Sequence, residues 1–216
     1  MNYGEIKTAS QQYTDRYDSE LVTAIPAFTS IVESKINTSL RVGKQSVRAQ
    51  IWLENNEEYY GLPSDFGGFR DVEILSSGNN SLNNNGGGGG GTPLTYLAPE
   101  EMNKLNRNQS VYRYYTVIAN QIQIAPPTNN EILEVVYYSH VPPLSADTDT
   151  NWLSQAHPDV YIFGLCTEIS AFAKDAEGFG GYDARFKECL AMITQDDQIE
   201  RWSGPALRSQ VDGMIV

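Results

Sequence analysis

The 216-residue chain contains little cysteine, little histidine and few basic residues. Its two cysteines, Cys166 and Cys189, are too few for a disulfide scaffold and indicate a reducing compartment. Its two histidines, His140 and His157, do not show the clustered spacing of a metal site. No stretch approaches the roughly 18 apolar residues of a membrane-spanning helix. The first residues lack the basic and apolar regions of a secretory signal.

Acidic residues outnumber basic ones, with 27 Asp and Glu against 15 Lys and Arg, which gives a net charge of −12. Tight binding to bare nucleic acid requires a basic surface, so this class of function is disfavoured. An anionic membrane surface is disfavoured for the same reason. Aromatic residues make up 11% of the chain, with 13 tyrosines among them, and this content predicts a folded protein.

Apolar residues at helical spacing predict helices at both ends of the chain. Near the N-terminus, Pro26 is predicted to restart a helix, because proline suits a first turn and disrupts an interior one, and Gly43 is predicted to end it. Two long helices are predicted at 158–174 and 182–202, separated by a glycine-rich turn at 178–181. The predicted helical core comprises Leu21, Phe28, Ile31, Val32, Ile36, Leu40, Val160, Phe163, Phe186, Leu190 and Ile193.

From Ser46 onward the apolar period changes to two, which predicts strands. Residues 47–53 and 57–60 are predicted to form a hairpin around Asn55 and Asn56. Further strands are predicted at 69–75, 95–97, 112–118, 121–125 and 131–140, with a short helix opening at Pro99. The order of elements predicts an α+β fold, in which an α-helical bundle of N-terminal helices and two long C-terminal helices carries an inserted antiparallel β-layer.

The predicted organisation is discontinuous. A helical core is expected over 1–45 and 150–203, a β-rich insertion over 46–149, and an extended C-terminal segment over 204–216. Within the insertion, the Gly/Asn-rich segment 78–91 includes six consecutive glycines and is predicted to form a mobile surface loop. It lacks the lysine of a phosphate-binding loop, so no nucleotide or other cofactor is expected.

Pairs of adjacent tyrosines on the predicted strands are the strongest indication of an interaction surface in the sequence. Side chains alternate along a strand, so one ring of each pair is expected in the core and the other on the outer face. Tyrosine is favoured at protein interfaces, although covering a half-wet sheet would use the same pattern. The candidate interface residues for oligomer or tail contacts are Tyr59, Tyr60, Tyr114, Tyr115, Tyr137 and Tyr138.

Catalytic patterns are weak. His157 and Asp159 could form the acid–base pair of a small hydrolase. Pro158 between them is a good helix start, however, and an acid in the first turn interacts favourably with the helix dipole, so a structural role is favoured. Cys166 and Cys189 are expected to be small buried side chains. No catalytic residue is assigned.

The C-terminal segment has features of a docking arm. Gly204 and Pro205 break the last helix, which leaves the following backbone free to add as a strand to another protein's sheet edge. Two apolar anchors and two cations accompany this break. The candidate docking residues are Arg201, Trp202, Gly204, Pro205, Leu207 and Arg208.

Four stretches resemble the head-to-tail adaptor, or connector, proteins of tailed bacteriophages, especially podovirus-type phages. The first is the segment 25–41, with a proline start and an Asn-x-x-Leu-Arg end. The second is the Leu-Pro-Ser-Asp-Phe bend at 62–66. The third covers 137–145, 151–153 and 157–161, and the fourth runs from Ala184 to Arg208. The insertion at 78–91 departs from the family pattern.

This resemblance implies a non-enzymatic structural protein. It implies a ring, usually dodecameric, beneath the portal protein at the capsid vertex, which closes the packaged head, extends the channel for double-stranded DNA and offers a platform for tail or nozzle proteins. The location would be the head–tail interface of the virion, after assembly in the host cytoplasm. Residues 201–216 would be the portal-docking arm. Two other functions stay open: a tail-attached β-module that binds a host receptor or glycan, and the small hydrolase.

Overall fold

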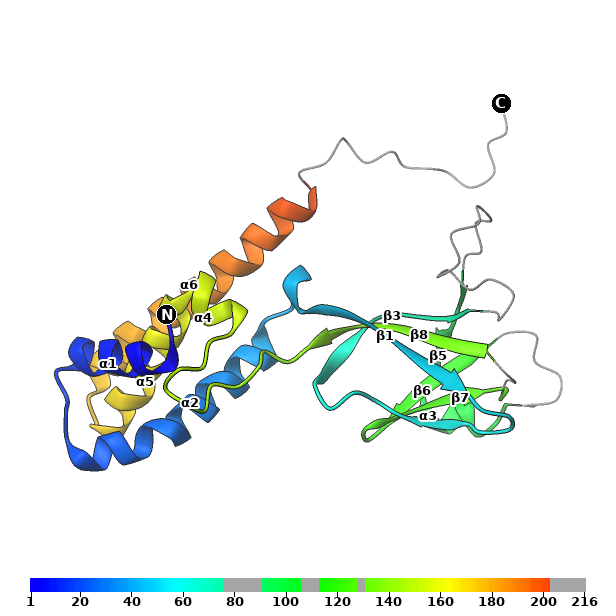
Figure 1. Cartoon of the computed structure of the whole chain (residues 1–216), viewed down its shortest axis with the longest axis horizontal. Helices are drawn as coiled ribbons and strands as arrows, with labels where there is room; N and C mark the ends of the chain where they lie inside the picture. The colour runs from blue at the N-terminus through cyan, green and yellow to red at the C-terminus, as the bar shows by residue number, and fades with distance from the viewer. Residues whose placement is uncertain (76–90, 106–112, 128–130, 203–216) are drawn as a thin grey trace. The chain divides into compact units, whose positions relative to one another are not determined.

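The computed structural model describes residues 1–75, 91–105, 113–127 and 131–202, the side chain of Trp202 excepted. The chain divides into two compact units (Figure 1). The helical unit combines Met1–Gly43 with Val141–Val216, and the sheet unit is Lys44–His140. An α+β fold with a β-layer was predicted, and this prediction is confirmed.

The helical unit is built around α5, a helix that packs against all the other helices of this unit. α1 begins at a capping box in which Asn2 and Glu5 each accept a hydrogen bond from the other's backbone N–H. The predicted helix at 158–174 is confirmed as α5, and α4 was not predicted. The helices are α1 (Tyr3–Thr14), α2 (Ser19–Ser39), α4 (Trp152–Ala156), α5 (Pro158–Phe172) and α6 (Ala176–Trp202).

The prediction that Pro26 restarts a helix is wrong, because α2 runs through it without a break. Pro26 lies on the exposed side of α2, where its ring meets solvent. The opposite side carries a buried row of residues, including Leu21, Ile25 and Val32, whose packing holds the helix together across the missing N–H. The stop at Gly43 is also misplaced, since α2 ends at Ser39.

The buried row also corrects one core assignment. Ile31 was predicted in the core, but 44% of it is exposed, whereas the neighbouring Val32 is fully buried. Phe28 and Phe163 are half-buried and pack at the edge of the core. The other predicted core residues of the helical unit are buried.

The glycine-rich turn predicted at 178–181 is wrong as well, because α6 already begins at Ala176 and includes these glycines. The carboxylate of Asp175 accepts a hydrogen bond from the Gly178 N–H at 3.0 Å, in the manner of an N-cap side chain. The Tyr182 hydroxyl donates to the Tyr13 carbonyl at 2.9 Å and ties this first part of α6 to the end of α1. These contacts stabilise a helix that glycine alone disfavours.

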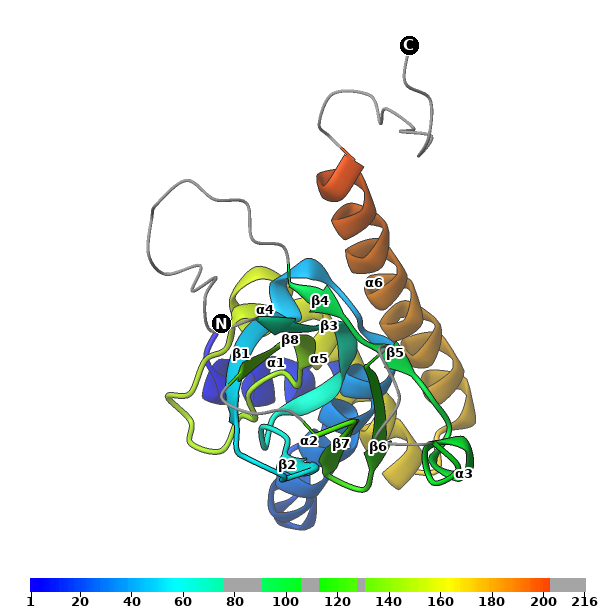
Figure 2. The same cartoon turned by 90° about the vertical axis from the view of Figure 1, so that its right-hand side faces the viewer.

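The sheet unit contains two four-stranded sheets, ordered β1-β8-β3-β4 and β2-β7-β6-β5. Figure 2 looks onto this unit and shows the first sheet above β2, β7 and β6. All strand pairs are antiparallel except β5 with β6. The strands are β1 (Ser46–Leu53), β2 (Tyr59–Gly61), β3 (Phe66–Leu75), β4 (Thr92–Pro93), β5 (Thr95–Tyr96), β6 (Tyr114–Ile118), β7 (Gln121–Ala125) and β8 (Glu131–Ser139), with α3 (Pro99–Met102) between β5 and β6.

The hairpin predicted between 47–53 and 57–60 is wrong. β1 pairs with β8, from Ser46 opposite Tyr138 to Leu53 opposite Glu131, whereas β2 pairs with β7 in the other sheet. β8 is rich in β-branched and aromatic residues and lies between β1 and β3, so the two halves of the expected hairpin belong to different sheets. Apolar residues from both sheets share one core. The predicted pair of strands around Ala119 and Asn120 is confirmed as β6 and β7.

A polar network places the segment that enters the helical unit after β8. The Asn151 side-chain amide donates to the Pro142 carbonyl at 2.7 Å and to the buried Tyr161 hydroxyl at 2.8 Å. On α2, the carboxylate of Glu33 accepts from the Leu144 N–H at 2.8 Å. Because the network is buried or partly buried, each of these bonds satisfies a group that would otherwise be costly to desolvate.

The contact between α2 and α5 at Gly164 gives a test of this packing. A Cβ atom at Gly164 would lie 2.6 Å from Val32 Cγ1, whereas a Cβ atom at Gly180 meets nothing within 4 Å. Gly164→Ala should therefore lower the free energy of unfolding by about 1–3 kcal/mol through overpacking. Gly180→Ala should raise it by about 0.5–1 kcal/mol through helix propensity. Denaturant unfolding monitored by circular dichroism measures both, and equal shifts for the two variants would contradict the α2–α5 crossing.

Candidate interaction surfaces

The end of α6 holds the first of the predicted docking residues. Arg201 forms an ion pair with Asp197 at 2.7 Å, and the same carboxylate accepts a hydrogen bond from the Gly43 N–H at 2.5 Å. A Cβ atom at Gly43 would lie only 3.0 Å from Asp197, so glycine permits this close approach. Arg201 thus supports the junction between the end of α6 and the segment after α2. Sequence reasoning missed this role, because the partners lie more than 150 residues apart.

The other predicted docking positions fall outside the described residues. These positions are the side chain of Trp202 and the residues Gly204, Pro205, Leu207 and Arg208. Most of the Gly/Asn-rich segment 78–91 also falls outside, with Gly91 as the exception.

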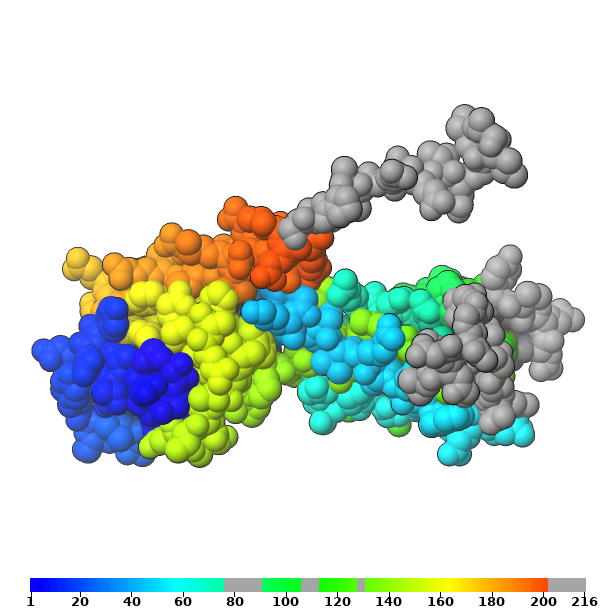
Figure 3. All heavy atoms as spheres, turned by 45° about the horizontal axis from the view of Figure 1, so that its top comes forward, coloured from blue at the N-terminus to red at the C-terminus, as the bar shows by residue number. Residues whose placement is uncertain are grey.

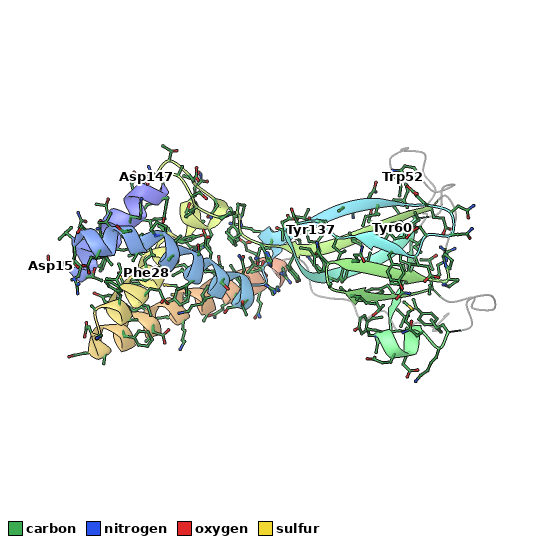
Figure 4. The ribbon with its side chains drawn as sticks, turned by 90° about the horizontal axis from the view of Figure 1, so that it is seen from below. Asp15, Phe28, Trp52, Tyr60, Tyr137 and Asp147 are labelled. Atoms are coloured by element: carbon green, nitrogen blue, oxygen red, sulfur yellow. The ribbon has the colours of Figure 1, made fainter. Side chains whose placement is uncertain are left out.

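Two of the tyrosine pairs divide between core and surface. In β2, Tyr60 is buried while Tyr59 is 43% exposed, and in β8 Tyr137 is buried while Tyr138 is half-buried. The Tyr60 hydroxyl accepts from the Glu54 N–H at 3.0 Å, and the Tyr137 hydroxyl donates to the Asp65 carboxylate at 3.0 Å. Burial, aided by the Asp65 charge, raises the pKa of Tyr137. Figure 4 labels Tyr60 and Tyr137 within the sheet unit.

The third pair lies in β6, where both Tyr114 and Tyr115 are half-buried. Tyr115 makes edge-to-face contacts with Tyr96 and Phe69, with ring centroids 5.6 Å and 5.5 Å apart. Such contacts stabilise the sheet unit itself. Tyr115 is therefore occupied within the chain, and Tyr59, Tyr114 and Tyr138 are the paired tyrosines with surface left for a partner.

The sheet unit has two further exposed aromatic residues that sequence reasoning did not assign to an interface. Trp52 is 62% exposed and Tyr96 is 54% exposed (Figure 4 labels Trp52). Ala49, Ile51 and Leu53 face the core of the unit, so the period of two along β1 places Trp52 on the outer face. That alternation is visible in the sequence and was a signal for this site.

His157 and Asp159, the candidate hydrolase pair, line a groove of about 390 Å³ together with Cys189, Met192 and Ile199 of α6. His157 connects α4 to α5, and Asp159 lies in the first turn of α5, as the structural interpretation of the sequence expected. The Cys189 thiol and the Asp159 carboxylate line the same groove. The groove thus brings together a thiol, a carboxylate and an imidazole.

The protonation of the thiols opposes their use as nucleophiles. Burial, together with the nearby Asp159 carboxylate, raises the pKa of Cys189 to about 12. Burial also raises the pKa of Cys166 to about 12, and its sulfur lies 3.7 Å from the Ser10 carbonyl oxygen. Nucleophilic cysteines need the opposite shift, because the thiolate is the reactive form.

Neither a metal-binding cluster nor a membrane-spanning helix is present among the described residues. Within residues 1–75, 91–105, 113–127 and 131–202, no group of three or more His, Cys, Asp or Glu side chains is placed to hold a metal ion. None of the helices described is both long enough and apolar enough to span a membrane.

Comparison with known proteins adds an independent observation. The model of the SU10 adaptor protein family matches residues 1–209, which covers both units and nearly the whole chain. The search of curated proteins returned no match. The family match agrees with the resemblance in the four sequence motifs, and the chain therefore belongs to the SU10 adaptor proteins, a family of phage head-to-tail adaptors.

Proposed function

We propose that this phage adaptor forms a ring, dodecameric as in the related connectors, which binds beneath the portal protein. In this position it closes the packaged head, extends the DNA channel and presents a platform for tail proteins. The observation that carries the proposal is the family match over residues 1–209. A structural adaptor belongs in the virion, and we infer that it assembles there from protein made in the host cytoplasm.

The charge of the chain supports a channel role. The net charge is −12, and a channel wall of this sign repels the phosphate backbone. Double-stranded DNA could then move through the ring without binding to it. A protein that holds DNA by its phosphates would need the opposite balance of charge.

We assign different contacts to the two units. We infer that the helical unit, with the α6 end, forms the body that meets the portal, and that residues 201–216 act as the docking arm. Arg201 already pairs with Asp197, so of the two arginines in the arm we assign Arg208 to a portal carboxylate. The exposed aromatic residues of the sheet unit, Trp52, Tyr59 and Tyr96, have the composition expected of contacts with neighbouring subunits or tail proteins.

Truncation after Ser203 tests the docking arm. The deletion removes none of the described core residues, so circular dichroism should match that of the full chain. Full-length protein mixed with isolated portal rings should appear as capped rings by negative-stain microscopy, and truncated protein should leave the portals bare. Arg201 and Asp197 stay in place, so the end of α6 serves as an internal control. Truncated protein that capped portals with wild-type affinity would contradict the arm and leave the helical body as the docking surface.

Substitution in the groove tests the non-enzymatic proposal. His157→Ala and Cys189→Ser should leave portal capping and phage infectivity within about twofold, because the proposed function assigns neither side chain to catalysis. A catalytic general base or nucleophile would instead cost at least about 100-fold. Loss of infectivity of that size, in virions that assemble normally, would overturn the structural assignment and favour the hydrolase.

A further inference from the structure

One side of α6 carries a regular stripe that is not fully covered by the helical unit. Its members recur at alternating spacings of three and four residues, which places them in one line along a helix. We refer to them as the α6 stripe. The α6 stripe consists of Tyr182, Arg185, Cys189, Met192, Asp196 and Ile199.

Four of the six stripe residues are exposed, whereas Tyr182 is half-buried and Cys189 is buried beneath its neighbours. Met192 and Ile199 are 61% and 60% exposed, and Arg185 and Asp196 are also exposed. A groove of about 540 Å³ follows its first part, beside Tyr182 and Arg185. The groove of about 390 Å³ follows the rest. In Figure 3 the orange atoms of α6 form a border of the helical unit.

Charge along the α6 stripe is polarised. Arg185 lies toward its start, with the guanidinium carbon 5.4 Å from the centre of the Phe163 ring. Asp196 lies toward its end, and Asp159 lines the same groove. Among residues in the described ranges, neither Arg185 nor Asp196 has an ion-pair partner. Each is therefore available to a partner of opposite charge.

When a second α6 stripe runs in the opposite direction, the residues of the two stripes complement each other. We propose that two copies of this chain pair through the α6 stripe as antiparallel helices, around a two-fold axis between Leu190 and Ala191. This register is the one that sets Arg185 of one copy opposite Asp196 of the second copy. The same register sets Tyr182 opposite Ile199, and Cys189 opposite Met192. The charged residues then meet residues of opposite charge, and the less polar residues meet one another.

The complementarity decides the direction of pairing. A parallel pair in register would oppose Arg185 with Arg185 and Asp196 with Asp196, and like charges in contact are destabilising. The antiparallel pair replaces both repulsions with two Arg–Asp ion pairs, related by the two-fold axis. At about 1.5 Å per residue, the stripe from Tyr182 to Ile199 gives a contact roughly 26 Å long. The Met192 and Ile199 side chains lose their exposure to water in this contact.

This pairing goes beyond the proposed ring and does not depend on it. A two-fold contact uses the same patch on both copies, whereas a closed ring of more than two copies needs two different patches that meet head to tail. The antiparallel pair is therefore a form of the free protein, before it reaches a portal. It would cover the most exposed apolar side chains of α6 until assembly.

Charge reversal in the full chain tests the pairing. Sedimentation velocity and light scattering should find the wild type as a dimer. Arg185→Asp or Asp196→Arg alone should weaken the dimer at least about tenfold, because each places two like-charge contacts in the symmetric interface. The double variant R185D/D196R should recover the dimer, since both ion pairs form again with their signs exchanged. Lys187→Glu changes net charge as R185D does but lies on the other side of α6, and should have no effect.

The outcomes separate the antiparallel pair from its alternatives. Loss of the dimer in both single variants, with recovery in the double variant, supports the proposal. A wild type that stays monomeric at high micromolar concentration overturns it. A dimer that ignores the single reversals, or that the double variant fails to restore, also overturns it. Portal capping by the same proteins is measured separately, and capping lost with a monomeric wild type would mean that the stripe binds the portal instead. Circular dichroism confirms that each variant is folded.

Discussion

The burial of α5 among the other helices is the constraint on which the helical unit depends. α1, α2, α4 and α6 all pack on this helix. Gly164 lets α2 approach at Val32, where any side chain on α5 would collide. The Tyr161 hydroxyl, on the same helix, holds Asn151 and through it the segment that follows β8. A single apolar helix thereby fixes both the N-terminal helices and the returning chain, and leaves the far side of α6 as surface.

The features of the molecule that point to function are exposed side chains suited to binding other proteins. The groove that joins His157, Asp159 and Cys189 has the residue types of a catalytic site, but burial and the Asp159 charge keep the thiol protonated. The exposed features are instead aromatic side chains on the sheet unit and a polarised stripe on α6. Both features fit the contacts that we propose for this member of the SU10 adaptor family.

Local signals predicted some elements well, and tertiary packing decided the others. The strands β6 and β7 with their Ala119–Asn120 turn, the apolar β8 and the proline start of α5 each have strong local patterns, and all were predicted. Pro26 and the glycines at 178–181 have equally clear local patterns for breaks, yet buried packing and the Asp175 cap carry both helices through them. The expected hairpin does not form, because β1 pairs with β8 in one sheet and β2 pairs with β7 in the other. The Arg201–Asp197–Gly43 junction depends on distant residues, so only the fold could reveal it.

We propose above that this chain forms the ring between portal and tail. Cryo-electron microscopy of the head–tail junction, in virions that contain the chain, is the decisive measurement. We expect a closed ring of copies directly against the portal, with the C-terminal residues reaching into it and DNA passing through the centre. Density for this chain at the distal tail, or virions with a complete neck that lacks the chain, would overturn the proposed ring.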